Sequence, residues 1–213
     1  MSTFNIAVLV SGNGSNLQSL INLSLASNSN FKICCVGTNN PEANALKRIE
    51  DEHISSISLD HSKFDSREEF DMKMAMELQK FNIDLLVLAG YMRILSKDFI
   101  NLFKNKIINL HPSLLPKYPG LNTHEKVLEN NDIHHGVTVH YVDEGLDTGP
   151  IIAFTKVETM HHDINSLEKK IHETEHKLLP TIVSLISNGR VELQNREVLI
   201  DMEVYKNGKE FIF

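Results

Sequence analysis

The sequence predicts an α/β fold, a mostly parallel, twisted sheet with helices on both faces. Short apolar runs rich in Val, Ile and Leu alternate along the chain with segments of helical periodicity. Strands joined by helices form parallel sheets, which are covered on both faces. The 213 residues correspond to one large domain, or one domain with a short appendage, at about 150 residues per domain. We expect one domain over residues 1–189 and a tail, residues 190–213, packed on it.

The first half of the chain alternates strands and helices. Its apolar runs predict strands at residues 5–10, 33–36, 54–59, 85–89 and 107–110. One helical pattern begins near Leu17, a second covers residues 43–52, and a third begins after Ser96.

The clearest helix begins after Ser66. Glu69 follows three residues later, which fits a capping box. Apolar residues then repeat at helical spacing, at Phe70, Met74, Leu78 and Phe81. We expect this apolar face to pack on the sheet.

The second half adds elements of a different kind. Residues 112–122 hold three prolines and a glycine, which predicts an ordered loop beyond a strand's carboxyl end, where open α/β sheets bind ligands. Residues 137–141 alternate and residues 151–157 form a β run, so we expect added antiparallel strands. A long helix ends at Gly189, and Pro180 is expected to kink or interrupt it. The tail from Arg190 resembles a hairpin.

Composition excludes several classes of protein. With 21 Lys and Arg against 28 Asp and Glu, the net charge is −7, so we expect no nucleic-acid partner. The two cysteines, Cys34 and Cys35, are adjacent, which disfavours a structural disulfide. No apolar run approaches the roughly 18 residues that span a bilayer. We expect a cytoplasmic protein without a membrane partner, as a monomer or a weak homodimer.

The glycine-rich loop at residues 12–16 (GNGSN) lies between a predicted strand and a predicted helix. Free backbone N–H groups and the positive helix end bind phosphate there. Leu17 takes the place of the third glycine of a dinucleotide loop, and residues 38–40 offer no acid for a ribose. A single phosphomonoester fits best, and the alternative is a tight turn that needs positive φ.

Asn109 and His111 stand two residues apart at the end of an apolar strand, so they project to the same side. The amide can donate to a developing oxyanion and the imidazole can donate a proton. Asp147 is a candidate for keeping this imidazole charged, because a nearby carboxylate raises a histidine pKa. Alternatively, these residues satisfy loop backbone groups and Asp147 caps a turn.

His140 either supports the same cleft or is a hydrogen-bonded core histidine. Neither cysteine lies near a histidine-bearing loop, and no Gly-x-Ser-x-Gly elbow exists. We therefore expect direct group transfer without a covalent enzyme intermediate.

Residues 172–176 (HETEH) match the H-E-x-x-H pattern of zinc peptidases. No recognisable third-ligand motif follows them, and we favour a solvated or phosphate-facing helix without metal. For the same reason the doublets His134-His135 and His161-His162 are interpreted as surface loop residues.

Five motifs resemble, in order, those of the phosphoribosylglycinamide formyltransferases, a family of folate-dependent enzymes of purine synthesis. They are residues 10–17 (VSGNGSNL), 64–68 (FDSRE), 88–95 (LAGYMRIL), 108–116 (INLHPSLLP) and 146–150 (LDTGP). The match spans almost the whole chain to about Pro180. The Asn-x-His-Pro segment is shared by a wider group of formyltetrahydrofolate enzymes, whereas GNGSN and residues 117–120 (KYPG) are typical of this family.

The resemblance implies a Rossmann-like formyltransferase fold, with glycinamide ribonucleotide as substrate and 10-formyltetrahydrofolate as co-substrate. The implied ribonucleotide contacts are Gly14, Ser15, Asn16 and Glu175. The implied folate contacts are Arg67, Met92, Arg93, Ile94, Leu95 and Asn109. His111 would be the proton donor, with Asp147 raising its pKa. The chain departs from many relatives at Asn122, where they carry a second histidine, and the tail after Arg190 is not diagnostic.

Other readings remain open on the sequence. A transfer RNA formyltransferase would carry a C-terminal nucleic-acid-binding domain and a formylfolate hydrolase an N-terminal regulatory one, and residues 1–213 leave room for neither. A sugar-nucleotide formyltransferase does not account for the GNGSN loop. From other classes, a zinc metallopeptidase predicts bound metal, and a non-catalytic nucleotide-binding module leaves Asn109, His111 and Asp147 unexplained.

Overall fold

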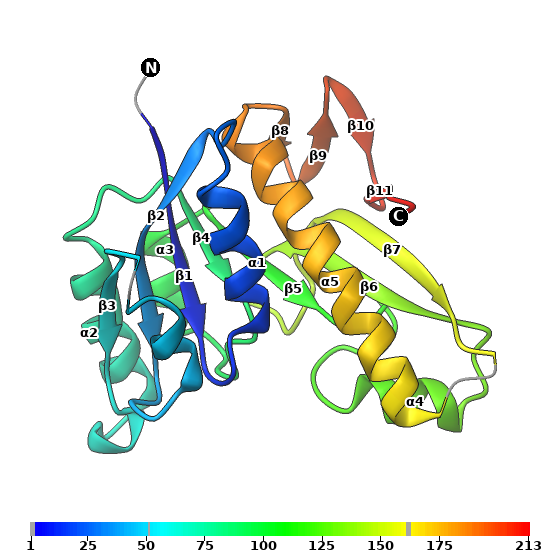
Figure 1. The fold of residues 1–213 in the computed structure, drawn as a ribbon, viewed down its shortest axis with the longest axis horizontal. Coiled ribbons are helices and arrows are strands. Elements are labelled where there is room, and N and C mark those ends of the chain that lie inside the picture. The colour runs from blue at the N-terminus through cyan, green and yellow to red at the C-terminus, as the bar shows by residue number, and fades with distance from the viewer. Residues whose placement is uncertain (1–2, 51, 161–162) are drawn as a thin grey trace. The chain divides into compact units, whose positions relative to one another are not determined.

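The computed structural model describes residues 3–50, 52–160 and 163–213. The chain forms two compact units, residues 1–109 and residues 110–213 (Figure 1). Each unit has its own sheet strands and its own helices.

The first unit is built on parallel strands, as predicted. They are β1 (Phe4–Val10), β2 (Phe31–Thr38), β3 (Ser55–Ser58), β4 (Leu85–Leu88) and β5 (Ile107–His111), the last of which runs on into the second unit. Within this unit the order is β5-β4-β1-β2-β3, and every pair is parallel. Chain order reverses between β1 and β4, the point at which open α/β sheets form a crevice at the carboxyl ends of their strands.

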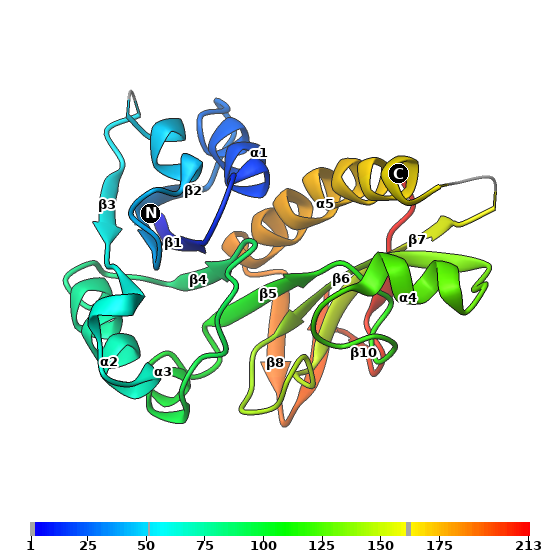
Figure 2. The same cartoon turned by 90° about the horizontal axis from the view of Figure 1, so that it is seen from below.

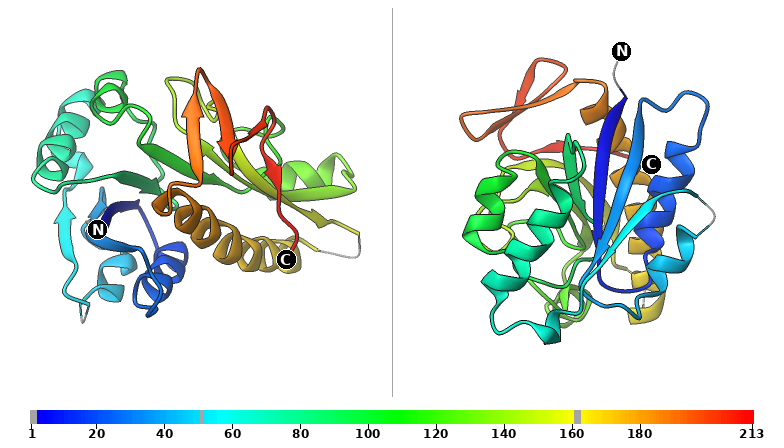
Figure 3. Two further views of the ribbon diagram at one scale, coloured as in Figure 1. Left: turned by 90° about the horizontal axis from the view of Figure 1, so that it is seen from above. Right: turned by 90° about the vertical axis from the view of Figure 1, so that its left-hand side faces the viewer.

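Helices cover both faces of this sheet. Figure 3, right, shows α1 (Ser15–Ser24) on one face and α2 (Arg67–Leu78) with α3 (Lys97–Leu102) on the other. The helix start predicted at Ser66 is confirmed, because its side chain accepts a hydrogen bond from the Glu69 N–H at 3.1 Å. Of the predicted apolar face, Phe70, Met74 and Leu78 are buried, and Phe81 lies beyond the helix end.

The helix predicted at residues 43–52 is wrong. The structure has only a 3-10 segment there, η1 (Asn44–Arg48), with Ala45 as its one buried residue. So short a segment gains little from burial, and short helices are marginal without it. A second 3-10 segment, η2 (His61–Lys63), follows β3.

The second unit has mixed strands. β6 (His134–Tyr141) and β7 (Ile151–Glu158) are antiparallel, as predicted, and β11 (Lys209–Glu210) pairs with the other edge of β7 in parallel. An ion pair between Lys156 and Glu210 at 2.9 Å and a hydrogen bond from Phe211 N to Phe154 O at 2.8 Å hold the end of the chain to β7. The tail forms an antiparallel sheet of β8 (Val191–Gln194), β9 (Glu197–Ile200) and β10 (Glu203–Tyr205), which confirms a hairpin.

Two helices complete this unit, α4 (Thr123–Glu129) and α5 (Ile164–Ser187), and α5 lies along β6 and β7 (Figure 2). The sequence analysis did not predict α4. Of the kink or interruption expected at Pro180, the interruption is wrong, since α5 continues through this residue. Leu178, Leu179 and Ile182 are fully buried around the proline, and this packing offsets the loss of one backbone hydrogen bond.

The assignment of His134-His135 to a surface loop is wrong. Both residues lie in β6, and His135 is buried with its Nε2 2.8 Å from Nδ1 of His124. Burial lowers the pKa of His135 to about 4. The doublet His161-His162 lies outside the described residues. No helix in the described ranges is both long and apolar enough to cross a bilayer.

Candidate active site

The glycine-rich loop of the first unit joins the end of β1 to the start of α1, as the sequence predicts. Gly14 has a φ of 72°, and a Cβ built on it would lie 2.7 Å from the Cβ of Ala45. Positive φ and this close approach both require glycine. Arg48 Nε donates to Asn13 O at 2.7 Å, and Ala45 N donates to Gly12 O at 3.1 Å. The loop is therefore held in a fixed shape by η1.

Ser15 and Asn16 open α1, and the first turn contains no acidic residue. This helix end combines backbone N–H groups with the positive pole of the helix dipole. A phosphate bound there would meet no negative side chain of the first turn. Of the predicted phosphate-binding residues, the structure brings Gly14, Ser15 and Asn16 together because they are consecutive.

Apart from Asn109 on β5, the predicted folate-binding residues of the first unit lie on α2 and on the segment after β4. Arg67 is exposed and pairs with Glu68 at 2.8 Å. Met92 and Ile94 are 69% and 57% exposed, which is unusual for large apolar side chains that stand so close together in the chain. The Arg93 guanidinium lies 4.5 Å from the centre of the Phe70 ring, and Leu95 is buried.

Asp71 supports this segment and was missed by the sequence analysis. It lies on α2, is 1% exposed, and accepts a hydrogen bond from Ser96 N at 2.6 Å. Burial raises the pKa of Asp71, and the hydrogen bonds from Ser96 oppose this effect. A polar residue among the apolar positions of a helix is the signal that could have revealed it.

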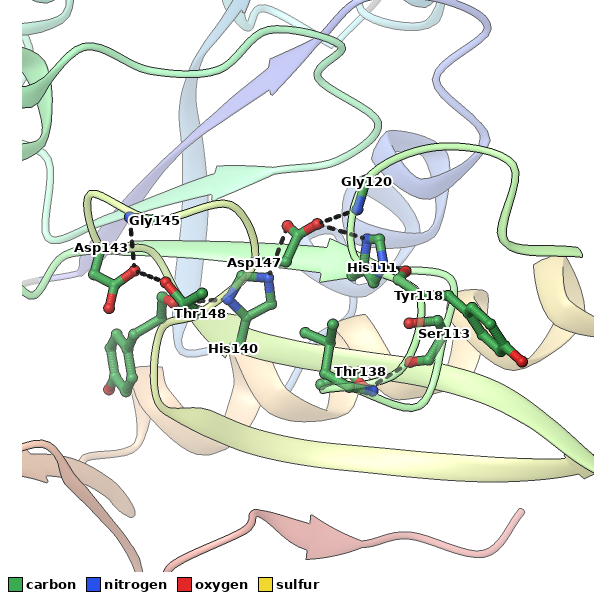
Figure 4. Close-up of polar contacts among 12 residues, drawn as sticks. His111, Ser113, Tyr118, Gly120, Thr138, His140, Asp143, Gly145, Asp147 and Thr148 are labelled. Carbon is green, nitrogen blue, oxygen red and sulfur yellow. Dashed lines mark hydrogen bonds and ion pairs between the residues drawn. The ribbon is translucent and has the colours of Figure 1, made fainter. Parts of the chain in front are cut away.

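Asp147 is the centre of a polar cluster in the second unit (Figure 4). It has a φ of 54° and accepts a hydrogen bond from Gly120 N through Oδ2 at 2.8 Å. The same oxygen lies 3.5 Å from His111 Nδ1, and Oδ1 lies 3.6 Å from His140 Nε2. The structure thus brings together two histidines and one carboxylate from three separate segments.

The surroundings of Asp147 favour its carboxylate form. Burial raises the pKa of Asp147, but hydrogen bonds from His140 and the Gly120 N–H, together with the positive charge of His111 when that ring is protonated, outweigh this effect, so the net shift of the pKa is downward. His140 is buried and its Nδ1 donates to Tyr141 O at 2.8 Å. That bond fixes the ring with Nε2 toward Asp147, in the supporting position that the sequence analysis considered.

The expectation that Asp147 keeps His111 charged needs correction. Burial lowers the pKa of His111 below its ordinary value, and this outweighs the Tyr118 carbonyl and the Asp147 carboxylate, which both raise it. His111 Nε2 donates to Tyr118 O at 2.8 Å. Both ring nitrogens therefore face acceptors, so a proton taken up by the ring is stabilised on either side.

Asn109 lies on β5 two residues before His111, half-buried and opposite Leu88 of β4. Side chains two apart leave a strand on the same side. Glu175, the remaining predicted ribonucleotide contact, is buried on α5.

The loop that carries Asp147 is held by a second carboxylate. Asp143 Oδ1 accepts from Gly145 N at 3.2 Å and from the Thr148 hydroxyl at 2.7 Å. Asp143 Oδ2 accepts from Arg196 Nη2 at 2.8 Å. Arg196 stands in the turn between β8 and β9, so the tail contributes to the loop, and no local sequence signal indicates this.

The zinc-peptidase interpretation finds no support in the geometry. His172 is exposed on α5 and His176 is half-buried. Across residues 3–50, 52–160 and 163–213, no group of three or more His, Cys, Asp or Glu side chains is arranged to hold a metal ion.

Comparisons with known proteins agree with the motifs. Residues 4–183 match the family model described as formyl transferase. The chain is 39% identical over 198 residues to phosphoribosylglycinamide formyltransferase of Escherichia coli (strain K12), covering 92% of this chain and 93% of the relative. It is also 39% identical over 189 residues to the human trifunctional purine biosynthetic protein adenosine-3, of which it covers 19%.

Solved structures give the same result. The phosphoribosylglycinamide formyltransferase of Coxiella burnetii, solved with CHES, has a TM-score of 0.93 and 37% identity and covers 99% of this chain and 100% of its own. Glycinamide ribonucleotide transformylase 1 of Symbiobacterium toebii has a TM-score of 0.89 and 34% identity, with 93% and 94% covered. The predicted fold class is confirmed.

Proposed function

The chain belongs to the formyl transferase family, and from this premise we propose that it formylates phosphoribosylglycinamide in de novo purine biosynthesis. The formyl group of 10-formyltetrahydrofolate is transferred to the amino group of N1-(5-phosphoribosyl)glycinamide. Two relatives named phosphoribosylglycinamide formyltransferase match this chain over nearly their full length. The observation that carries the assignment of the active site is the buried cluster of His111, His140 and Asp147. The free thiols Cys34 and Cys35 agree with a cytoplasmic location.

The chemistry of each predicted residue indicates which ligand it binds. The glycine-rich loop offers a phosphate the N-terminus of α1, through Gly14, Ser15 and Asn16. Glu175 contacts the ribonucleotide. The exposed apolar side chains Met92 and Ile94 offer a surface for an aromatic folate. Further folate contacts come from Arg67, Arg93, Leu95 and Asn109, the two arginines suiting carboxylates of the folate.

The reaction begins with attack of the substrate amine on the formyl carbon. A carbon–nitrogen bond forms, and the carbonyl oxygen of the tetrahedral intermediate becomes negative. The amide of Asn109 and the imidazole of His111 stabilise this oxygen by hydrogen bonds. Collapse of the intermediate breaks the bond from the formyl carbon to the folate nitrogen.

His111 also moves the proton that the transfer requires. In the complex with both ligands the neutral ring carries its proton on Nδ1, toward Asp147, so that Nε2 accepts the proton that the attacking amine loses, and Asp147 stabilises the resulting imidazolium. The ring then donates that proton to the departing folate nitrogen, which makes it the proton donor of the second step. His111 Nε2 is hydrogen-bonded to Tyr118 O. For Nε2 to bond to the formyl oxygen, that oxygen must therefore displace the Tyr118 carbonyl.

The test is a reconstituted reaction. Purified protein is mixed with synthetic glycinamide ribonucleotide and 10-formyltetrahydrofolate, and deformylated folate is followed by absorbance. We expect turnover only when both are present. Turnover without the ribonucleotide would indicate a hydrolase, and turnover only with an amino-sugar nucleotide would indicate the sugar-nucleotide alternative.

A further inference from the structure

We propose that Ser11 couples the glycine-rich loop at residues 12–16 to the predicted folate-binding segment at residues 92–95. Through this coupling, bound ribonucleotide strengthens the binding of folate, and bound folate strengthens the binding of ribonucleotide. The inference concerns Ser11 itself, the last residue before the loop at residues 12–16. It rests on the proposed function for the identity of the two ligands. The hydrogen bonds that carry it all lie within the first unit.

The position of Ser11 follows from the strand order. It directly follows β1, and Gly90 follows the adjacent parallel strand β4. The crevice of an open α/β sheet forms between such strands, where chain order reverses. A side chain at this point is close to both loops that leave the crevice.

Ser11 makes three hydrogen bonds there. Its backbone N–H donates to Gly90 O at 3.1 Å. Its hydroxyl oxygen accepts from Met92 N at 2.8 Å, and the hydroxyl donates to Asn39 Oδ1 at 2.6 Å. One small side chain thus fixes the backbone at the start of the segment at residues 92–95, and its donor and acceptor capacities are both used.

Asn39 gives the hydroxyl a fixed acceptor. It follows β2 and is buried, and its backbone carbonyl accepts from the backbone N–H of His61 at 3.3 Å and from the ring Nδ1 of His61 at 2.8 Å. The Asn39 backbone is therefore held in place from η2, and its side-chain Nδ2 lies 3.4 Å from Nδ1 of the same His61 ring. The Ser11 hydroxyl is oriented before either ligand arrives.

Each of the two segments also has a separate support. η1 holds the loop through Arg48, and Asp71 holds the far end of the folate segment through Ser96. Loss of the Ser11 hydroxyl therefore leaves both segments folded but removes its bond between them. A ligand that orders one segment then no longer lowers the cost of ordering the other.

The coupling can be measured without catalysis. Tetrahydrofolate carries no formyl group, so it forms an unreactive ternary complex with glycinamide ribonucleotide. Calorimetry gives the dissociation constant of each ligand with and without a saturating amount of the other. We expect each ligand to tighten the other by the same factor, because coupling is reciprocal, and by about fivefold, the lower end of typical couplings.

In Ser11→Ala we expect this factor to fall below about twofold, on the same scale of coupling. Ser24→Ala is the matched control, since its hydroxyl bonds only to Ile21 O among the contacts the structure gives, at 2.8 Å on α1. The control should keep the wild-type factor. If Ser11→Ala does not fold, Ser11→Cys keeps the size of the side chain with a weaker donor and acceptor, and it should give a reduced factor.

The outcomes separate the two proposals. If the wild-type protein binds neither ligand, the proposed function fails and the coupling fails with it. If both ligands bind but independently, or if Ser11→Ala keeps the wild-type factor, the role of Ser11 is refuted and the function stands. Reciprocal coupling that is lost only in the Ser11 variants supports it.

Discussion

The proposed function assigns different means of binding to the glycine-rich loop and to the Asp147 cluster. The loop uses five consecutive residues, 12–16, and its working groups are backbone N–H groups at the start of α1. The cluster uses side chains that come from β5, β6 and the loop after β6, and all of them are largely buried. A backbone site tolerates changes of side chain but not of φ. A side-chain cluster has the opposite sensitivity, and the two sites should therefore respond differently to substitution.

The largest effect should come from the side-chain cluster. His111→Ala or Asn109→Ala removes a hydrogen-bond donor to the developing oxyanion, and kcat should fall by about 10²–10³. The melting temperature of each variant checks that the fold persists. His134→Ala, exposed on β6, is the control and should keep wild-type turnover. Near-normal turnover in either site variant would remove that residue from the mechanism.

Asp147→Asn should change the pH profile as well as the rate. The Asp147 carboxylate raises the pKa of His111, so its loss moves that pKa still lower. Proton acceptance requires the neutral ring, and activity falls as pH drops through the His111 pKa. The acidic limb of kcat/KM should therefore move to lower pH, by roughly one unit, together with a fall in kcat. An unchanged acidic limb would show that His111 does not set it.

In the glycine-rich loop, the position at which a substitution should weaken ribonucleotide binding most is a glycine, Gly14. Gly14→Ala forces a methyl group against Ala45 at positive φ, which costs about 1–3 kcal/mol. The KM for the ribonucleotide should rise by about tenfold or more, since each 1.4 kcal/mol is a factor of ten, with a smaller change in kcat. A Cβ on Gly12 meets nothing within 4 Å, so Gly12→Ala should leave the free energy of unfolding almost unchanged.

Arg67→Ala tests whether the predicted folate-binding residues bind folate independently of the glycine-rich loop and of the Asp147 cluster. Arg67 is exposed and its ion pair with Glu68 is on the surface, so its loss should not lower the melting temperature. We expect folate binding to weaken by about tenfold, as for a hydrogen bond to a charged group, and ribonucleotide binding to change less. Calorimetric titration with each ligand checks this. Lys73→Ala on the same helix is the control, and a larger loss of ribonucleotide binding would reverse the assignment.

The smallest effect should come from Arg196, at the edge of the side-chain cluster. Exposed ion pairs contribute about 0.2–1 kcal/mol, so Arg196→Ala should lower kcat by no more than a fewfold through the Asp143 loop. Arg190→Ala breaks another exposed pair of the tail, with Asp201 at 2.6 Å, and should leave kcat unchanged. Equal effects of the two variants would mean that the tail acts on overall stability and not on the loop.

The same contrast explains what the sequence could predict. The glycine-rich loop and the Asn109 and His111 pair are local patterns, and the structure places them where the spacing predicts. The pKa of His111 depends on burial by segments far along the chain, so its direction could not be read from neighbours in sequence. The contact of Arg196 with Asp143 joins residues 53 apart, and no local rule indicates it.

The fold shows the same limit. Apolar runs located the strands, but α4 was missed because it follows Asn122 in a left-handed conformation and buries only Thr123 and Val127. The position of His135 could have been predicted from the β6 pattern, because the two-residue alternation of Val137 and Val139 extends back to it and places all three side chains on the same side of the strand.

The pairing of β11 with β7 has a practical consequence for handling the protein. Lys209 and Glu210 pair with Ala153 and Phe154 of β7, so the last strand covers part of an edge that would otherwise offer unpaired backbone groups. Exposed edges of this kind recruit other chains and lead to aggregates. Shortening the chain before residue 208 would therefore reduce solubility on storage, and an affinity tag is better fused ahead of β1.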